Sequence, residues 1–355
     1  MELLNTILNL IYFILIIGIV IIIHELGHFI SAKKAGVYVY EFSIGMGPKL
    51  HTFHRKNDPT EYNLRLFPVG GYVAMAGETE PEGEKKIPKD EQLVNKSWGL
   101  RMRTMLAGVG MNFILALVVF FIVALCVGAS TNDCIVEEVA DGYPAKEYLV
   151  KGDQLIKMNG KDIISYDAFQ VELLVNNGAT STFTVKHADG TIDTYAISSK
   201  EDKDEKGNVS HHYGFAITSP IEYGFLASIK YAFRKFFSLI HQMILILGYL
   251  IVGKISLTSL SGPVGIYTVV KESSAAGFIN LIYLLGYISL NVGFINLLPL
   301  PAMDGGHAFF LIIEKLKGSK VDPKFESTVH AVGLVLLLIL MLLVTGHDIY
   351  NLFIK

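Results

Sequence analysis

The stretch that decides the fold lies near the N-terminus, where residues 10–30 read LIYFILIIGIVIIIHELGHFI. Residues 3–23 carry no charged side chain. About 20 apolar residues are enough to cross the ~30 Å hydrocarbon core of a bilayer. The uncharged run leads directly into His24, Glu25 and His28. This segment therefore predicts a membrane-spanning helix with metal-binding side chains at its end.

The composition places the whole chain in the membrane class. Of its 355 residues 51% are hydrophobic and 18% charged, a balance that soluble domains rarely have. Three more uncharged runs are long enough to span, at residues 104–132, 273–303 and 327–347. The net charge of −3 offers no basic surface for nucleic acid, so none is expected as a partner. We expect a polytopic α-helical membrane protein with about four transmembrane helices.

Lysine and arginine near the helix ends indicate the orientation, because they are enriched on the cytoplasmic side. They gather after the first helix, before the second and between the last two. The expected segments are residues 1–32 (first transmembrane helix), 33–103 (cytoplasmic side, with a membrane β-hairpin at about 61–76), 104–132 (second helix), 133–218 (extracytoplasmic β-rich domain), 219–272 (surface-lying or re-entrant amphipathic region), 273–304 (third helix, with an Asp ligand), 305–326 (cytoplasmic loop) and 327–350 (fourth helix).

Two parts outside the spans are expected to contain β-structure. Residues 61–76 hold two β-prone runs around Pro68 and a pair of glycines, which predicts a hairpin. Residues 77–97 are rich in Glu, Lys and Pro and are expected to form a mobile loop. Residues 133–218 alternate short β-prone runs with Asp-Gly and Asn-Gly turns around one helical stretch. That pattern predicts a small β-rich domain.

The chemistry begins at the end of the first helix. Helical residues four apart share a face, so the imidazoles of His24 and His28 can bind one metal ion. Glu25 is placed beside them to accept a proton from a metal-bound water. Such groups are costly to desolvate at membrane depth and mark functional sites. The alternative, that they only end the helix at the headgroups, is disfavoured because Phe29 and Ile30 continue the apolar run.

A third ligand is expected at the same depth on another helix, since catalytic zinc usually takes three protein ligands. Asp304 ends an uncharged run and follows Pro299 and Pro301, which interrupt the helix and let a carboxylate turn sideways. His307 is a rival ligand. The requirement for equal depth also decides whether the apolar run at 236–252 spans the membrane. If that run crossed the membrane, Asp304 would lie on the opposite side from His24. We therefore expect residues 236–252 to lie on the membrane surface or to re-enter.

Together these residues resemble the site-2 protease family of intramembrane zinc metalloproteases, most closely the bacterial branch that cleaves anti-sigma factors. The resemblance covers nearly the whole chain. It is carried by His24-Glu-Leu-Gly-His28, Leu66-Phe-Pro-Val-Gly-Gly-Tyr-Val73, Asn112, one inserted domain, Ser261-Gly-Pro-Val-Gly-Ile266, Asn296-Leu-Leu-Pro299 and Asp304-Gly-Gly-His307.

The resemblance implies a zinc metalloendopeptidase of regulated intramembrane proteolysis. It makes the metal ligands His24, His28 and Asp304, the general base Glu25, and the substrate-binding residues Asn296, Asn112, Gly70 and Gly71. The insert resembles a single PDZ domain, which in this family restricts access to substrates already trimmed outside the membrane. The implied substrates are single-pass proteins, such as a trimmed anti-sigma factor or a signal-peptide remnant. The implied location is the bacterial cytoplasmic membrane, with the lipid bilayer as partner.

Two departures from the family pattern and two other functions are weighed against this interpretation. Met303 stands where the family usually has Leu, and Val109 where it usually has Pro, and neither departure puts the chemistry in doubt. A membrane transporter or metal-binding protein would also carry intramembrane His and Asp, but no inverted repeat is visible. A catalytically dead PDZ receptor would have no use for the buried base Glu25.

Overall fold

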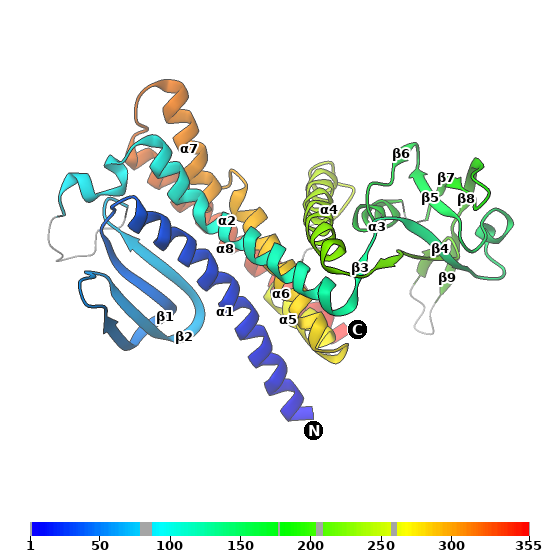
Figure 1. Ribbon diagram of the computed structural model, residues 1–355, viewed down its shortest axis with the longest axis horizontal. Helices are drawn as coiled ribbons and strands as arrows, with labels where there is room; N and C mark the ends of the chain where they lie inside the picture. The colour runs from blue at the N-terminus through cyan, green and yellow to red at the C-terminus, as the bar shows by residue number, and fades with distance from the viewer. Residues whose placement is uncertain (1, 79–86, 177, 204–208, 257–260, 355) are drawn as a thin grey trace. The chain divides into compact units, whose positions relative to one another are not determined.

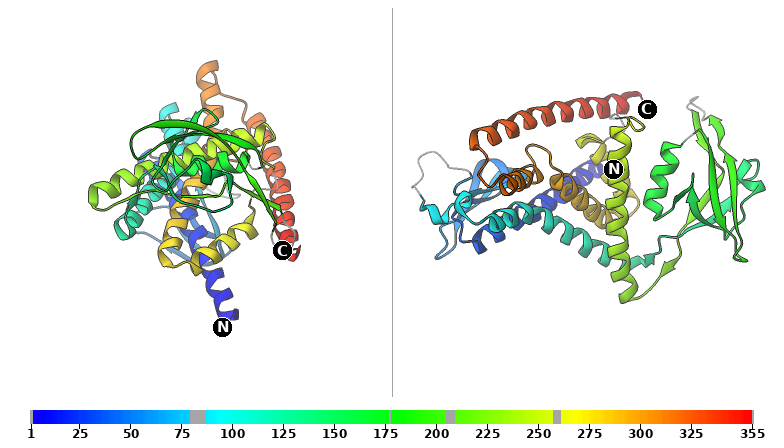
Figure 2. Two further views of the ribbon diagram at one scale, coloured as in Figure 1. Left: turned by 90° about the vertical axis from the view of Figure 1, so that its right-hand side faces the viewer. Right: turned by 90° about the horizontal axis from the view of Figure 1, so that it is seen from above.

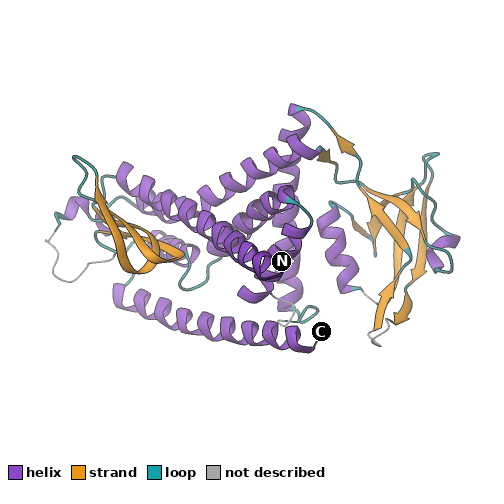
Figure 3. Cartoon of the chain, turned by 90° about the horizontal axis from the view of Figure 1, so that it is seen from below, coloured by secondary structure: helices purple, strands orange, loops and turns teal. Residues whose placement is uncertain are grey.

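The computed structural model of the chain describes residues 2–78, 87–176, 178–203, 209–256 and 261–354 (Figure 1). The chain forms two compact units, one of residues 1–119 with 260–355 and one of residues 120–259. Residues 79–86 of the expected mobile loop lie outside the described residues. The strands form separate sheets, with one sheet in the first unit and the others in the second (Figure 3).

The first unit is a bundle of apolar helices. Its helices are α1 (Glu2–Lys34), the first part of α2 (Trp98–Val127), α5 (Pro263–Ala275), α6 (Phe278–Leu297), α7 (Asp304–Lys317) and α8 (Pro323–Ile354). Ile16 and Val20 of α1 share a buried cluster with Leu281 and Ile288 of α6, and both helices run from the lower right to the upper left in Figure 1. Helix α8 lies at the periphery of the bundle (Figure 2), and most of its apolar side chains are exposed as lipid contact requires.

The third expected span differs from its prediction. Residues 273–304 do not form one helix, because α5 ends at Ala275, α6 ends at Leu297 and an irregular segment follows. Asp304 is the first residue of α7 rather than the last of a span. Most of the loop expected at 305–326 is helical, since α7 continues to Lys317, and the cytoplasmic side of this segment stays a prediction. Helix α7 is amphipathic and carries Lys315 and Lys317 in its last turn.

The hairpin expected within residues 61–76 is wrong in its pairing. These residues form a single strand, β2 (Glu61–Met75), whose antiparallel partner is β1 (Val39–His54). Residues 41–44 pair with both 61–64 and 71–74, so the two long strands bend together into a broader sheet. The glycines that the sequence placed in a turn instead bend β2, as Gly70 does at φ 95°. The β1–β2 sheet packs beside α1 (Figure 1).

The second unit holds the β-rich insert. Its main sheet has the order β11-β4-β5-β7-β8, with β6 paired to β5. The strands of this sheet are β4 (Cys134–Val139), β5 (Gln154–Met158), β6 (Lys161–Asp162), β7 (Thr180–Lys186), β8 (Ile192–Ser198) and β11 (Phe215–Thr218). Two short antiparallel pairs accompany it, β3 (Ala129–Ser130) with β12 (Ile221–Glu222) and β9 (Lys200–Lys203) with β10 (Val209–His212). Phe169, Phe183 and Leu155 are fully buried in its core, which gives the insert its own hydrophobic centre.

Two helices complete the second unit. Ser165 caps α3 (Tyr166–Val175) by accepting the backbone N–H of Ala168 at 3.2 Å. Helix α4 (Phe225–Ile251) packs against α3, and Lys235 pairs with Asp167 at 2.7 Å. Among the described residues, α1, α2, α4, α6 and α8 are long and apolar enough to cross a membrane, and α4 is the least hydrophobic of the five.

Candidate metal centre

Three side chains from α1 and the start of α7 converge inside the first unit. Nε2 of His24 lies 3.1 Å and Nε2 of His28 3.3 Å from Oδ2 of Asp304, and the two Nε2 atoms are 3.2 Å apart. Atoms bonded to a tetrahedral zinc at about 2.0–2.2 Å are about 3.3–3.5 Å from one another. The lone pairs of these three atoms would repel without a cation or proton between them. The triangle therefore fits a zinc ion that leaves a fourth position open.

Helix α2 orients both histidine rings. Nδ1 of His28 lies 2.8 Å from the carbonyl oxygen of Thr104, so it donates there and leaves Nε2 free for a metal. The side-chain amide of Asn112 lies 3.3 Å from Nδ1 of His24. With the amide oxygen turned toward the ring, Asn112 accepts the Nδ1 proton in the same way. Ser289 of α6 in turn donates to the backbone oxygen of Asn112 at 2.9 Å, which ties a third helix to this arrangement.

Two glycines let α1 and α2 approach closely enough for these contacts. A Cβ atom on Gly108 would lie 2.4 Å from Nε2 of His28 and 2.8 Å from Nε2 of His24. A Cβ on Gly27 would lie 2.3 Å from the backbone oxygen of Ala107. Neither glycine nor Thr104 was expected to belong to the site. The one available signal was that Gly27 lies inside the histidine motif, whereas Gly108 resembles any glycine of an apolar helix.

Comparison with known proteins identifies the family of the chain. The sequence profile of peptidase family M50 matches residues 12–340. The chain belongs to peptidase family M50, the site-2 proteases. It is 35% identical over 342 residues to a Clostridium acetobutylicum protein named as a zinc metalloprotease, covering 96% of this chain and 97% of the relative.

Two Bacillus relatives also align along almost their whole length. The zinc metalloprotease RasP of Bacillus licheniformis is 29% identical over 423 residues, and the regulator of sigma-W protease RasP of Bacillus subtilis is 29% identical over 422 residues. Each alignment covers 97% of this chain and 99% of the relative. The M50 chain is thus a zinc metalloprotease, and its apolar helices make it a multi-pass membrane protein.

The remaining expected site residues of the M50 protease lie around the triangle. Glu25 is half-buried, and its Cγ lies 3.5 Å from where a Cβ on Gly71 would stand. Gly71 itself has no room for a side chain, because that Cβ would also lie 2.8 Å from the backbone oxygen of Ser43. Gly70 faces Met46 rather than the triangle. Asn296 is half-buried in the last turn of α6.

The rival ligand His307 belongs to a different cluster of the protease. Its Nδ1 lies 3.1 Å from Oε1 of Glu326, and its ring stacks on that of His330 at 3.8 Å. His307, Glu326 and His330 could together approach a single ion. The structure thus separates His307 from Asp304, although the two residues lie only one helical turn apart.

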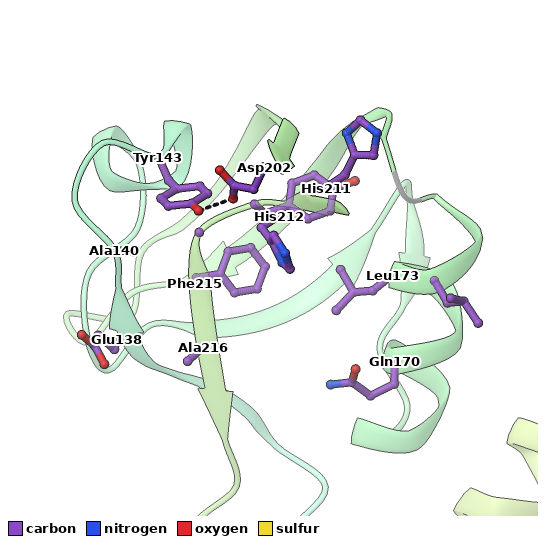
Figure 4. Close-up of a pocket in the computed structure, with 13 residues that line it drawn as sticks. Glu138, Ala140, Tyr143, Gln170, Leu173, Asp202, His211, His212, Phe215 and Ala216 are labelled. Atoms are coloured by element: carbon purple, nitrogen blue, oxygen red, sulfur yellow. Dashed lines mark hydrogen bonds between the residues drawn. The ribbon is translucent and has the colours of Figure 1, made fainter. Parts of the chain in front are cut away.

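The insert of the protease carries a groove of about 720 Å³ between α3 and β11 (Figure 4). Gln170 and Leu173 line it from α3, while Phe215 and Ala216 line it from β11. Strand β11 is at one end of the sheet order, so its outer edge faces this groove. Tyr143 donates a hydrogen bond to Asp202 at the rim. A groove beside an edge strand has the geometry in which an extended peptide can add to a sheet.

Proposed function

We propose that this protease hydrolyses a peptide bond inside the transmembrane segment of single-pass membrane proteins. We assign His24, His28 and Asp304 as the zinc ligands and Glu25 as the general base. The observation that carries the proposal is the triangle of Nε2, Nε2 and Oδ2 atoms with sides of 3.1 to 3.3 Å. Both histidines are 8% exposed and lie on a helix apolar enough to cross the membrane.

The side chains of the site divide the chemical work. A zinc ion held by the triangle supplies Lewis-acid chemistry, lowering the pKa of a water molecule toward 7 and polarising the substrate carbonyl. Thr104 and Asn112 keep the imidazoles in the tautomer that presents Nε2. Glu25 accepts the proton of the attacking water and returns it to the leaving amine. The surrounding apolar helices limit other water, which strengthens each electrostatic contact.

The β1–β2 sheet provides a place for the unwound substrate. A helical peptide bond is hidden in its own hydrogen-bonding pattern, so cleavage needs an extended chain. Residues 71–75 pair with residues 39–44 on one side, and no other described strand pairs with their free side, which forms an edge. Gly71 lies against Glu25, so a peptide added along that edge would pass the base. Asn296 is proposed to hold its backbone, whereas Asn112, which is buried against His24, is proposed to act by orienting that ring.

The direction of the helices supports four spans rather than five. Helix α1 ends near the triangle, and α6 runs parallel to it and ends shortly before Asp304. Helix α2 begins near the same level, because Thr104 contacts His28, and it ends on the far side. The chain between α2 and α6 must therefore cross an even number of times. We propose that α4 lies on the outer surface or re-enters instead of spanning.

The relatives indicate the class of substrate. The name of the Bacillus subtilis relative connects that protein with sigma-W. By this likeness we propose that the substrates here include a membrane-anchored anti-sigma factor or signal-peptide remnants. We place the protease in the bacterial cytoplasmic membrane, with its site toward the cytoplasm. The insert, which we interpret as a PDZ domain, would then face outward.

The test uses purified protease in proteoliposomes with a single-pass substrate truncated close to its outer membrane boundary. Mass spectrometry should find a cut inside the apolar segment with wild type and no cut with Glu25→Gln, which should keep one zinc per chain. Asp304→Ala should lose the zinc. Cleavage by Glu25→Gln at the wild-type rate, or full zinc content in Asp304→Ala, would show that the role assignments are wrong.

A further inference from the structure

The segment that delivers Asp304 to the site is held in an unfavourable backbone conformation. Ala302 has a φ of 67°, in the left-handed region that residues with a Cβ rarely occupy. Such conformations persist only where the surroundings hold them. The backbone N–H of Ala302 donates to Nδ1 of His330 on α8 at 2.8 Å. The strained residue two positions before Asp304 is therefore bonded to another helix.

Helix α8 fits this segment closely. A Cβ on Gly333 would lie 2.1 Å from Cβ of Pro301, so α8 touches the segment with no side chain between them. On the other side of the segment, a Cβ on Gly306 would lie 2.3 Å from the backbone oxygen of Leu300 and 3.1 Å from Cε1 of His330. The segment is thus confined between α7 and the first half of α8, a helix whose remaining length is mostly exposed.

The orientation of the His330 ring is itself determined by two neighbours. The ring of His307 stacks on it at 3.8 Å with an angle of 10° between the planes. Nδ1 of His307 lies 3.1 Å from Oε1 of Glu326, which precedes His330 by one turn of α8. Within the described residues, Nε2 of His330 is buried and has no hydrogen-bond partner. The hydrogen bond from the backbone N–H of Ala302 is therefore the polar contact of the His330 ring.

A metal ion bound by His307, Glu326 and His330 is the competing explanation of the cluster. Imidazoles bind metals through lone pairs that lie in the ring plane. The two rings are nearly parallel, so their lone pairs run side by side and do not converge on one point. Nδ1 of His330 is also already occupied by the Ala302 N–H. The observed geometry therefore favours the first explanation, in which His330 holds the segment, and disfavours a second metal site.

We propose that His330 is a positioning residue that aims the Asp304 carboxylate at the metal by holding the backbone of Ala302. This inference rests on the proposed role of Asp304 as a ligand. His24 and His28 are fixed by a regular helix, whereas Asp304 depends on an irregular segment and needs an outside support. Partners of metal ligands that act in this way typically change metal affinity or activity about 10- to 100-fold when removed.

The experiment compares His330→Leu, His330→Asn and His347→Leu in the full-length protein. Leu removes the acceptor, whereas Oδ1 of Asn stands at the same number of bonds from Cα as Nδ1 of His. His347 is a histidine near the other end of α8 and serves as the matched control. The readouts are zinc affinity by chelator competition, the visible spectrum of the cobalt-substituted protein, and kcat and KM for a single-pass substrate. Thermal unfolding checks that each variant is folded.

We expect His330→Leu to weaken zinc binding about 10- to 100-fold, to alter the cobalt spectrum and to lower kcat with little change in KM. His330→Asn should recover most of these losses, and His347→Leu should match wild type. A folded His330→Leu with wild-type affinity, spectrum and kcat overturns the proposal. So does a wild type that binds two zinc ions and loses one with His330→Leu. If Asp304→Ala keeps its zinc, the ligand assignment itself fails; if it loses zinc while His330→Leu does not, only the positioning role fails.

Discussion

The substitution Gly108→Ala tests the geometry of the metal centre without replacing any of the proposed ligands. The added methyl group would lie 2.4 Å from Nε2 of His28, 2.7 Å from Cε1 of His24 and 2.8 Å from Nε2 of His24. Ordinary contacts begin near 3.4 Å. The rings or the helices must therefore separate by about 1 Å at the tightest contact. The methyl group would stand within 3 Å of the two nitrogen atoms that we assign as zinc ligands.

A displacement of this size exceeds what a zinc site accepts. Metal–ligand distances are kept within about 0.2 Å, and a misplacement of about 1 Å near reacting groups can lower the rate about 100-fold. We therefore expect Gly108→Ala to lower kcat/KM at least about 100-fold, which corresponds to about 2.7 kcal/mol. Zinc content should fall as well, because both of the proposed histidine ligands are displaced together.

The assay measures zinc per chain and cleavage of a single-pass substrate in proteoliposomes. Gly110→Ala is the matched control, since it lies in the same helix and, among the described residues outside its own helical turns, no heavy atom lies within 4 Å of the added Cβ. Alanine is favoured over glycine inside helices by up to about 1 kcal/mol, so the control should be as stable as wild type or more so. If Gly108→Ala keeps one zinc and cleaves within threefold of wild type, the close approach of α2 is not what shapes the site.

Three further outcomes are expected. Burial alone would raise the pKa of Asp58, but hydrogen bonds from Lys33, Thr60 and Tyr62 outweigh this effect and hold the pKa well below its ordinary value. The carboxylate therefore stabilises the fold above about pH 4, and this stabilisation is lost as the pH falls. In thermal unfolding in detergent, Asp58→Asn should have a lower midpoint than wild type at pH 6, and its midpoint should fall less between pH 6 and pH 3. Burial raises the pKa of the Cys134 thiol to about 12, so maleimide at pH 8 should label it only after denaturation, and rapid labelling of the folded protein would contradict this. Asp167→Ala removes the carboxylate that pairs with Lys235 and should increase hydrogen exchange in α4, whereas replacing the exposed Asp162 should not. Equal exchange in the two variants would contradict the role of this pair.

The sequence was most informative where one short segment carries both structure and chemistry. The uncharged run before His24 predicts a helix, and the four-residue spacing puts His24 and His28 on one face, as α1 has them. The strands at residues 134–139 and 154–158 were also predictable, because alternating β-prone residues between Asn-Gly and Asp-Gly turns reflect local preferences. In each case the determining interactions lie within a few residues of one another.

Features that depend on distant segments were not predictable in the same way. The partner of β2 is β1, yet Gly45, Gly47 and Pro48 interrupt the β-prone pattern of β1 and hide it from a local analysis. Gly108 offers no local signal, because its role depends on two rings that lie some eighty residues earlier in the chain and pack against it. Both features were missed for the same reason. The type of a residue limits which contacts it can make, but it does not identify the segment with which it makes them.

The metal centre combines two kinds of support, and this determines how each should respond to change. His24 and His28 are held by a regular helix pressed against Gly108, so a perturbation there displaces both nitrogens at once and should remove the ion. Asp304 follows an irregular segment whose strained Ala302 is bonded to His330, so a perturbation there should loosen one ligand and weaken binding by degrees. Substitutions on the α2 side should therefore reduce the fraction of chains that hold zinc. Substitutions on the α8 side should reduce the affinity for zinc, so that excess zinc restores occupancy. A titration of both classes with zinc separates them, and equal recovery of Gly108→Ala and His330→Leu at high zinc would refute this division.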